Sequence, residues 1–222
     1  VFHKESHQKA TRLSFSEGVS DQLRALRALL ADNPLALPLL TEAVVTGCFA
    51  SFSAFIVPIV VQTLHQPPGV ASLLISIEGG VFILTVFLAG KLITHISALR
   101  LFLLSAAVTL FALTGLGFAR QALSVGAFAC VLGLGLGLFN LVTATRQGLV
   151  RGEKGKTVSL FTAAVGVGIS LGPMLGGQFA AHFEASAVFF AFIPMFVILA
   201  VLAVRESRQP GVAAALAVQD AN

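Results

Sequence analysis

Six long apolar stretches follow one another along this chain, and they constrain its fold more than any other feature. A transmembrane helix needs about 20 mostly apolar residues to cross about 30 Å of hydrocarbon. The stretches have about this length and predict membrane-spanning helices over residues 39–61, 71–93, 101–118, 122–144, 158–181 and 186–204. Charged residues make up only 11% of the chain, against roughly 25% in soluble domains. We therefore predict an all-α polytopic membrane protein with a bundle of six transmembrane helices.

The basic residues between these stretches indicate how the bundle is oriented. Lysine and arginine close to helix ends are retained on the cytoplasmic side of a membrane. They occur before the first stretch, in the second and fourth connections and after the sixth, whereas the opposite side has only Arg120. We expect an integral protein of the bacterial cytoplasmic (inner) membrane with both termini in the cytoplasm. Residues 1–38 form a cytoplasmic amphipathic linker, residues 39–204 the bundle and residues 205–222 a cytoplasmic tail.

Several function classes are disfavoured by the same sequence. The basic residues are spread over separate loops, without the clustered basic face and stacking aromatics typical of nucleic-acid binding. Cys48 and Cys130 lie inside apolar stretches and define neither a disulfide framework nor a metal site. No histidine pair has metal-ligand spacing on one helix face, so we expect no metal and no cofactor. Within the linker, residues 20–33 predict a helix along the membrane surface, or alternatively a solvated spacer.

Small and polar residues are shared unevenly among the predicted helices. The sixth is nearly pure hydrocarbon, and the third, with only Ser105, Thr109 and Thr114, resembles it. The other four carry further hydroxyls, an amide or an acid that need a protein partner or a watery cavity. In the fifth stretch, Gly168, Gly172 and Gly176 recur every four residues, so another backbone can approach closely along this side. Pro173 removes a backbone donor and predicts a bend there. The uneven distribution of polar residues predicts two groups of three helices, each ending in an outer helix.

These residues resemble motifs of the major facilitator superfamily. Gly168, Gly172 and Pro173, followed by the pair Gly176 and Gly177, match its glycine-proline antiporter motif, although Ser159 stands where that motif has an earlier glycine.

A second motif of this superfamily is only partly present. The family often has Gly-x-Leu-x-Asp-Arg-x-Gly-Arg between the second and third helices. Gly90, Leu92 and Arg100 match this cytoplasmic loop motif, but Thr94 and Ser97 replace its aspartate and glycine.

The resemblance covers nearly the whole chain and implies the C-terminal half of a twelve-helix transporter, built from two three-helix repeats. It implies that the first and fourth helices line a central cavity, that the second and fifth pack against the N-terminal half, and that the third and sixth support them from outside. Such transporters alternate access around a site near the midplane of the bilayer. We therefore expect secondary active transport of a small solute, with the N-terminal six-helix half, the substrate and the lipid bilayer as partners.

Candidate site residues are few. Glu78 is the acid that lies well inside a predicted span, and loss of hydration favours its neutral form, so it is a candidate for proton coupling or substrate contact. The alternative is that Glu78 only fixes packing. Glu42, near the cytoplasmic end of the first span, is expected to be an interfacial or gating residue. Asn140 either bonds a polar substrate or packs against another helix. Pro58 predicts a helix break at a gate, or is simply tolerated.

Two other classes of protein share features with this sequence. Gly168-Ile169-Ser170-Leu171-Gly172 fits the Gly-x-Ser-x-Gly pattern of serine hydrolases, but that pattern works as a strand-to-helix turn, and Ser170 is predicted to lie within a helix. We expect no enzyme activity. The second class is a half-size membrane protein that pairs with itself or with a partner chain. Because the sequence begins at Val1 rather than at methionine, we favour a fragment of a longer transporter, with apolar cavity residues suited to efflux of amphiphilic or drug-like compounds.

Overall fold

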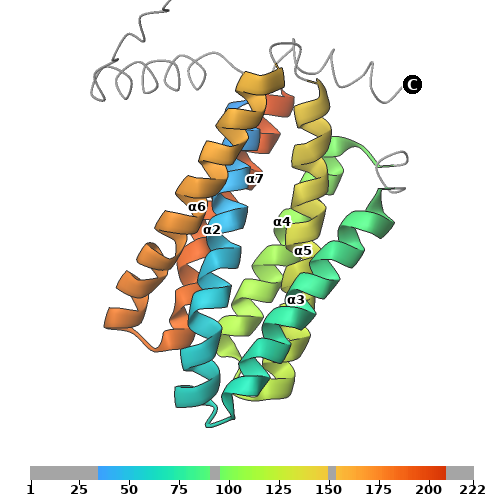
Figure 1. The fold of residues 1–222 in the computed structure, drawn as a ribbon. Helices are drawn as coiled ribbons and strands as arrows, with labels where there is room; N and C mark the ends of the chain where they lie inside the picture. Colours follow the sequence, from blue (N-terminus) through green and yellow to red (C-terminus); the bar gives the residue numbers. More distant parts are fainter. Residues whose placement is uncertain (1–34, 91–95, 150–153, 209–222) are drawn as a thin grey trace, which may run out of the picture. The chain divides into compact units, whose positions relative to one another are not determined.

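The computed structural model describes residues 35–90, 96–149 and 154–208, and all regular structure in these ranges is helical (Figure 1). The chain divides into two units, Val1–Ala36 and Leu37–Asn222, and the second unit contains the bundle discussed below. The predicted surface helix at residues 20–33, Leu92 of the loop motif and residues 150–153 of the fourth connection lie outside the described residues.

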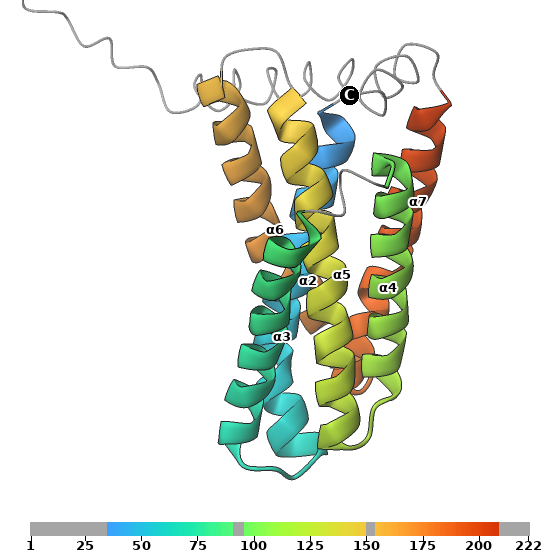
Figure 2. The same cartoon turned by 90° about the vertical axis from the view of Figure 1, so that its right-hand side faces the viewer.

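Each predicted span corresponds to one helix or to one helix with a distorted end. The elements are α2 (Ala36–Pro58), η1 (Ile59–Thr63), α3 (Pro68–Ala89), α4 (Ala98–Phe118), α5 (Ala122–Leu149), α6 (Lys154–His182), η2 (Ala185–Phe192) and α7 (Ile193–Ser207). Six helical segments of the described chain are long and apolar enough to cross a membrane. The prediction of an all-α six-helix bundle is therefore confirmed. Figure 2 shows consecutive spans running in alternate directions.

Proline determines where the first two helices deviate or begin. α2 continues through Pro58, which has helical dihedral angles, and then widens into the π-helical turn η1, whose closing bond joins Leu64 N to Ile59 O at 3.0 Å. Pro58 has no amide proton to give to the preceding turn, and a π-turn is one way to accommodate such a residue. α2 ends at Pro58, but the span continues without a break as η1 to Thr63. α3 begins at Pro68, which suits a first helical position because no donor is needed there.

The final span is composite. Its first eight residues form the 3-10 helix η2, and the α-helix α7 starts at Ile193 with Pro194 in its first turn. A 3-10 helix of this length is uncommon, because its hydrogen bonds are less well aligned than those of an α-helix. The single helix predicted over residues 186–204 is thus two segments of different pitch.

Glycines allow α5 to lie tightly between two other helices. A β-carbon at Gly133 would meet the backbone of Glu78, and one at Gly137 would lie 3.0 Å from Phe82 O, so both glycines face α3. A β-carbon at Gly135 would instead lie 3.0 Å from Thr109 N of α4. Close backbone approach of this kind stabilises helix pairs where lipid provides no hydrophobic driving force.

The glycine stripe of α6 contacts α2 of the same bundle. A β-carbon at Gly172 would lie 2.6 Å from Gly47 Cα, and one at Gly168 would lie 3.0 Å from Gly47 N. Further along, a β-carbon at Gly176 would lie 2.8 Å from the Phe55 ring. The stripe is buried, while most other positions along α6 are open. α6 is α-helical throughout, so Pro173 does not interrupt it.

Aromatic side chains fill the centre of the bundle. The ring of Phe139 on α5 packs edge-on against Phe102 of α4 at 5.0 Å between centroids, and lies 5.4 Å from Phe196 of α7. All three side chains are buried. The predicted outer helices α4 and α7 thus pack against each other as well as against α5, and their scarcity of polar residues reflects this apolar contact.

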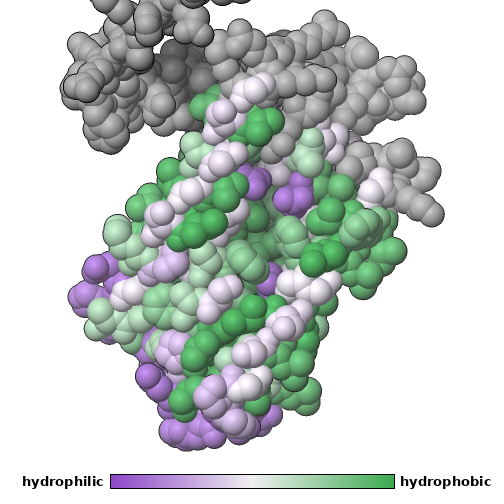
Figure 3. All heavy atoms as spheres, in the orientation of Figure 1, coloured by the Kyte–Doolittle hydropathy of each residue, from purple (hydrophilic) through white to green (hydrophobic). Residues whose placement is uncertain are grey.

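Two helices are left with little cover. The buried share of the apolar window is 17% in α3 and 17% in α6, against 39–50% in the other four spans. Large apolar side chains are exposed along both helices, among them Leu84 and Phe87 on α3 and Met174 on α6. Figure 3 shows this face as mostly hydrophobic, with hydrophilic residues gathered towards one end. These faces require either lipid or protein against them.

Candidate functional site

Glu78 lies near the middle of α3, deeper than its sequence position suggested. α3 begins at Pro68, ten residues before Glu78, which corresponds to about 15 Å along the helix axis or half of the hydrocarbon thickness. The residue is 0% exposed. Neither carboxyl oxygen has a hydrogen-bond partner among the residues that the structure describes. An unpaired carboxylate in such a place costs about 3 kcal/mol or more, so the group needs a proton, water or a partner that arrives from elsewhere.

The Glu78 carboxyl group is buried where α3 packs against α5. Gly133 of α5 faces the Glu78 backbone, and the Glu78 side chain is fully buried. Beside it, positions Gly79 and Gly80 have no heavy atom within 4 Å of where a β-carbon would stand. The carboxyl group is therefore enclosed by the bundle, while the next two residues of α3 border open space.

A second polar contact joins α2 to α5 away from Glu78. The Thr143 hydroxyl lies 3.3 Å from Glu42 Oε2 and is also within reach of two backbone oxygens of its own helix, including Asn140 O at 3.0 Å. Thr143, which contacts Glu42, lies ten residues after Gly133, which faces Glu78, and this is about 15 Å along α5. The structure thus brings Glu42, Thr143 and Asn140 together at one level of the bundle and leaves Glu78 at another.

Additional buried hydroxyls have no partner in the described part of the chain. They belong to Ser51 and Ser53 on α2 and Thr109 on α4. Ser51 lies one turn from Cys48, on the side of α2 that faces the bundle interior. Because a hydroxyl without a partner is costly in an apolar interior, these groups mark places where water or a polar ligand group is favourable.

Two ion pairs were missed by the sequence analysis. Arg146 Nη1 lies 2.9 Å from Glu206 Oε2, with side-chain exposures of 13% and 17%, and the guanidinium stands 5.9 Å from the Phe102 ring centroid. This pair joins α5, α7 and α4 at one end of the bundle. At the other end, Arg120 pairs with Glu184 at 2.7 Å. The sequence offered only isolated charges as a signal, because the partners are 60 and 64 residues apart.

The remaining predicted residues fall in different places. Gly168, Gly172 and Gly176 form the contact with α2, whereas a β-carbon at Gly177 would have 3.9 Å to the Phe55 ring. Gly90 caps α3, and Arg100 is exposed in the first turn of α4. Among the described residues, no three metal-binding side chains gather.

The hydrolase-like pattern does not form an active-site turn. Ser170 lies inside the continuous helix α6, twelve residues before His182 of the same helix, which is about 18 Å along its axis. A nucleophile elbow needs a strand-to-helix turn with a histidine within hydrogen-bond reach.

Comparison with known proteins agrees with the six spans and the glycine stripe. Residues 39–219 match the Major Facilitator Superfamily, and the chain belongs to this family. It is also similar to the multidrug efflux protein YfmO of Bacillus subtilis (strain 168), with 28% identity over 195 residues, covering 84% of this chain and 49% of that protein. The chain thus spans about half the length of the curated relative it matches. It is an integral membrane protein.

Proposed function

We propose that this chain is the C-terminal half of a secondary transporter that exports a small amphiphilic solute by alternating access, with Glu78 exchanging a proton during the cycle. The observation that carries the proposal is the Glu78 carboxyl group, which is fully buried near mid-membrane depth and has both oxygens without a partner in the described structure. Intramembrane acids in such places are typical of ion and proton pathways.

The uncovered faces of α3 and α6 support a missing half. Ser72, Ser76 and Gly80 recur every four residues on the exposed side of α3. Thr162, Gly166 and Ser170 do the same on the exposed side of α6. Such small-residue stripes allow close contact with another helix, and hydroxyls are better covered by protein or water than by lipid. The likeness to one half of a longer relative agrees with this arrangement.

The proposed proton exchange at Glu78 follows from the lack of a charged partner for its carboxyl group. In the state described, no cation is paired with its carboxyl group within the described residues, so the neutral acid is the stable form. When the bundle rocks, water reaches the open space beside Gly79 and Gly80. Hydration then lowers the free-energy cost of the charged carboxylate, and the proton can leave. Alternation between a dry and a wet surrounding would couple proton movement to the change of access.

The substrate class follows from the walls and the polar groups. The interior offers aromatic and aliphatic surface together with a few hydroxyls and the Asn140 amide, which suits amphiphilic solutes better than highly charged ones. YfmO is named as a multidrug efflux protein, which fits this class. The hydrogen bond between Thr143 and Glu42 can hold α2 and α5 together or release them, so we assign these residues to the cytoplasmic gate of the proposed transporter. In this orientation both termini lie in the cytoplasm.

The test is transport by the intact protein in proteoliposomes with an imposed pH gradient. A lipophilic fluorescent cation such as ethidium is the probe, and Glu78→Gln removes the titratable proton while keeping the side-chain volume. We expect its pH-driven transport to fall to the level of protein-free liposomes while membrane insertion is unchanged. Glu153→Gln, in the connection after α5, is the matched control and should transport normally. Undiminished pH-driven transport by Glu78→Gln would refute the proton role.

A further inference from the structure

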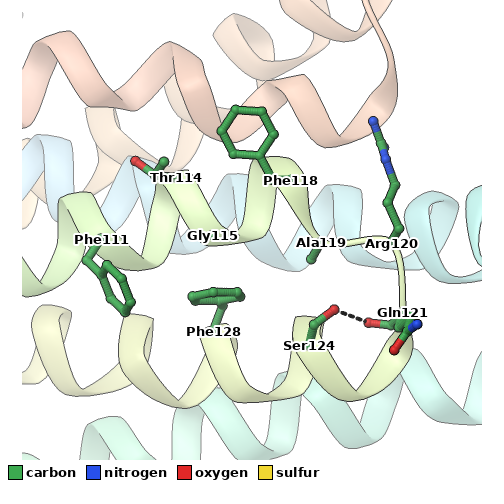
Figure 4. A pocket seen from close by; sticks show the side chains of 9 residues that line it. All are labelled: Phe111, Thr114, Gly115, Phe118, Ala119, Arg120, Gln121, Ser124 and Phe128. Carbon is green, nitrogen blue, oxygen red and sulfur yellow. Dashed lines mark hydrogen bonds between the residues drawn. The ribbon is translucent and has the colours of Figure 1, made fainter.

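A groove lies on the surface of the bundle between α4 and α5, at the end where these two helices are connected. It encloses about 520 Å³, which is within the roughly 300–1,000 Å³ range of small-molecule sites. Phe111 and Phe118 of α4 and Phe128 of α5 line it with apolar surface, and Arg120 and Ser124 line the end next to the α4–α5 connection, which we call the mouth. Figure 4 shows the Arg120 side chain extending from there away from Phe128 and Ser124. The groove is separate from Glu78 and from the bare faces of α3 and α6.

The aromatic walls are held in place by local packing. Gly115 has no side chain, so the Phe128 ring lies directly against the α4 backbone there. The same ring meets Phe111 edge-on at 5.6 Å between centroids, and Phe118 packs against Phe190 of η2 at 5.2 Å. Figure 4 shows Phe111 and Phe128 turned towards each other between the two helices. Each of the three rings that line the groove thus has an aromatic partner, while Phe111 and Phe118 remain largely exposed.

The dimensions and position of the groove fit a lipid chain. Phe111 and Phe118 are seven residues apart, which is about 10 Å along α4, and one leaflet of hydrocarbon is about 15 Å thick. α4 ends at Phe118, where polar and charged residues begin. An occupant that enters from the surrounding membrane would thus have its polar end at the mouth and its apolar part along the phenylalanines.

Both signs of charge occur beside the mouth, because Arg120, which lines the groove, pairs with Glu184, which does not. Arg120 Nη1 lies 2.7 Å from Glu184 Oε2 and 3.3 Å from Ser186 Oγ. Both contacts use the same nitrogen, so Nη2 and Nε of Arg120, and Oε1 of Glu184, are without a partner in the part of the chain that the structure describes. The two side chains are 55% and 68% exposed. Guanidinium is well matched to phosphate, and a carboxylate is matched to a primary ammonium group.

We propose that this groove binds one zwitterionic glycerophospholipid with a primary ammonium group, of the phosphatidylethanolamine class. One acyl chain lies along Phe111, Phe118 and Phe128, the phosphate binds Arg120, and the ammonium group binds Glu184. A lipid with net negative charge would meet repulsion from Glu184, whereas the zwitterionic headgroup complements both members of the ion pair.

The test is native mass spectrometry of the intact protein released from nanodiscs that contain equal amounts of phosphatidylethanolamine and phosphatidylglycerol. Arg120→Gln removes the phosphate partner, Glu184→Gln removes the ammonium partner, and Thr114→Trp fills the groove from an exposed position on α4. The matched controls are Arg100→Gln and Leu104→Trp, at exposed positions nearer the other end of the same helix. Elution volume and thermal unfolding verify that each variant is folded.

We expect each of the three groove variants to retain about tenfold less phosphatidylethanolamine than the wild type, since each removes a charge-assisted contact or the chain site. The two controls should retain wild-type amounts. Unchanged retention in Arg120→Gln or Thr114→Trp would overturn the site. Increased retention of phosphatidylglycerol by Glu184→Gln, without loss of phosphatidylethanolamine, would overturn the zwitterionic assignment. Neither outcome depends on transport, so this proposal can fail while the proposed function stands.

Discussion

Replacing Gly172 by alanine should destabilise the protein, because the added methyl group has no space at the crossing of α6 and α2. The β-carbon would lie 2.6 Å from Gly47 Cα and also meet Gly47 O. Both obstacles are backbone atoms, so the two helices must separate by about 1 Å to restore ordinary contact. Overpacking of this kind costs about 1–3 kcal/mol.

Gly166→Ala is the matched control for this prediction. It lies six residues earlier on α6, and no heavy atom stands within 4 Å of its β-carbon position. Alanine has the higher helix propensity, so this change should be neutral or stabilise the helix by up to about 1 kcal/mol.

Thermal unfolding of this chain, expressed alone and purified in detergent so that no N-terminal half can contact Gly166, compares the two variants. A loss of 1–3 kcal/mol corresponds to a decrease of about 2–12 °C in Tm for a chain of this size, whereas Gly166→Ala should unfold at or above the wild-type temperature. Equal Tm values for Gly172→Ala and the wild type, or an equal decrease in both variants, would refute the assignment of Gly172 to a tight helix crossing.

Two other substitutions test the remaining contacts. Arg146→Glu should lower the free energy of unfolding by about 2 kcal/mol, because it leaves the half-buried Glu206 beside a like charge. Combining Arg146→Glu with Glu206→Arg should restore most of this free energy. Additive losses in a double-mutant cycle would contradict the pairing. Gly133→Ala should reduce pH-driven transport, since its β-carbon would lie 3.2 Å from the backbone carbonyl carbon of Glu78 and force α3 away. The control is Gly126→Ala, whose β-carbon meets only the tip of the Leu74 side chain at 3.3 Å, and this variant should transport normally.

The spans were predictable because their signal is local. Length and hydropathy alone set all six, and the observed helices differ mainly at their ends, where α5 and α6 extend beyond the predicted spans. The η1 turn after Pro58 and the 3-10 helix η2 were not predictable, since an apolar run such as Val188–Phe192 has the same composition whichever helical pitch it adopts. Tertiary packing against neighbouring helices decides that choice.

The site was predictable only in part. Glu78 was identified because an acid inside an apolar span is unusual wherever its neighbours are. Its contact with Gly133, and the bond between Thr143 and Glu42, join residues 55 and 101 positions apart, and nothing local in the sequence indicates such pairs. The role of Gly133, Gly135 and Gly137 in fitting α5 between α3 and α4 is visible only in the fold, because each glycine faces a residue that is distant in the sequence.

The central claim is that α3 and α6 present their bare faces to another six-helix half rather than to lipid. The chain has no tryptophan, so Leu84→Trp on α3, Met174→Trp on α6 and Ile198→Trp on α7 each add one fluorophore at an exposed position. Quenching by brominated lipids, after subtraction of the emission of the unsubstituted intact protein, reports contact with acyl chains.

In the intact protein, we predict strong quenching at Ile198→Trp and little at Leu84→Trp and Met174→Trp. In this chain expressed alone, all three should be quenched, because the covering half is absent. Equal quenching of all three tryptophans in the intact protein would contradict the claim.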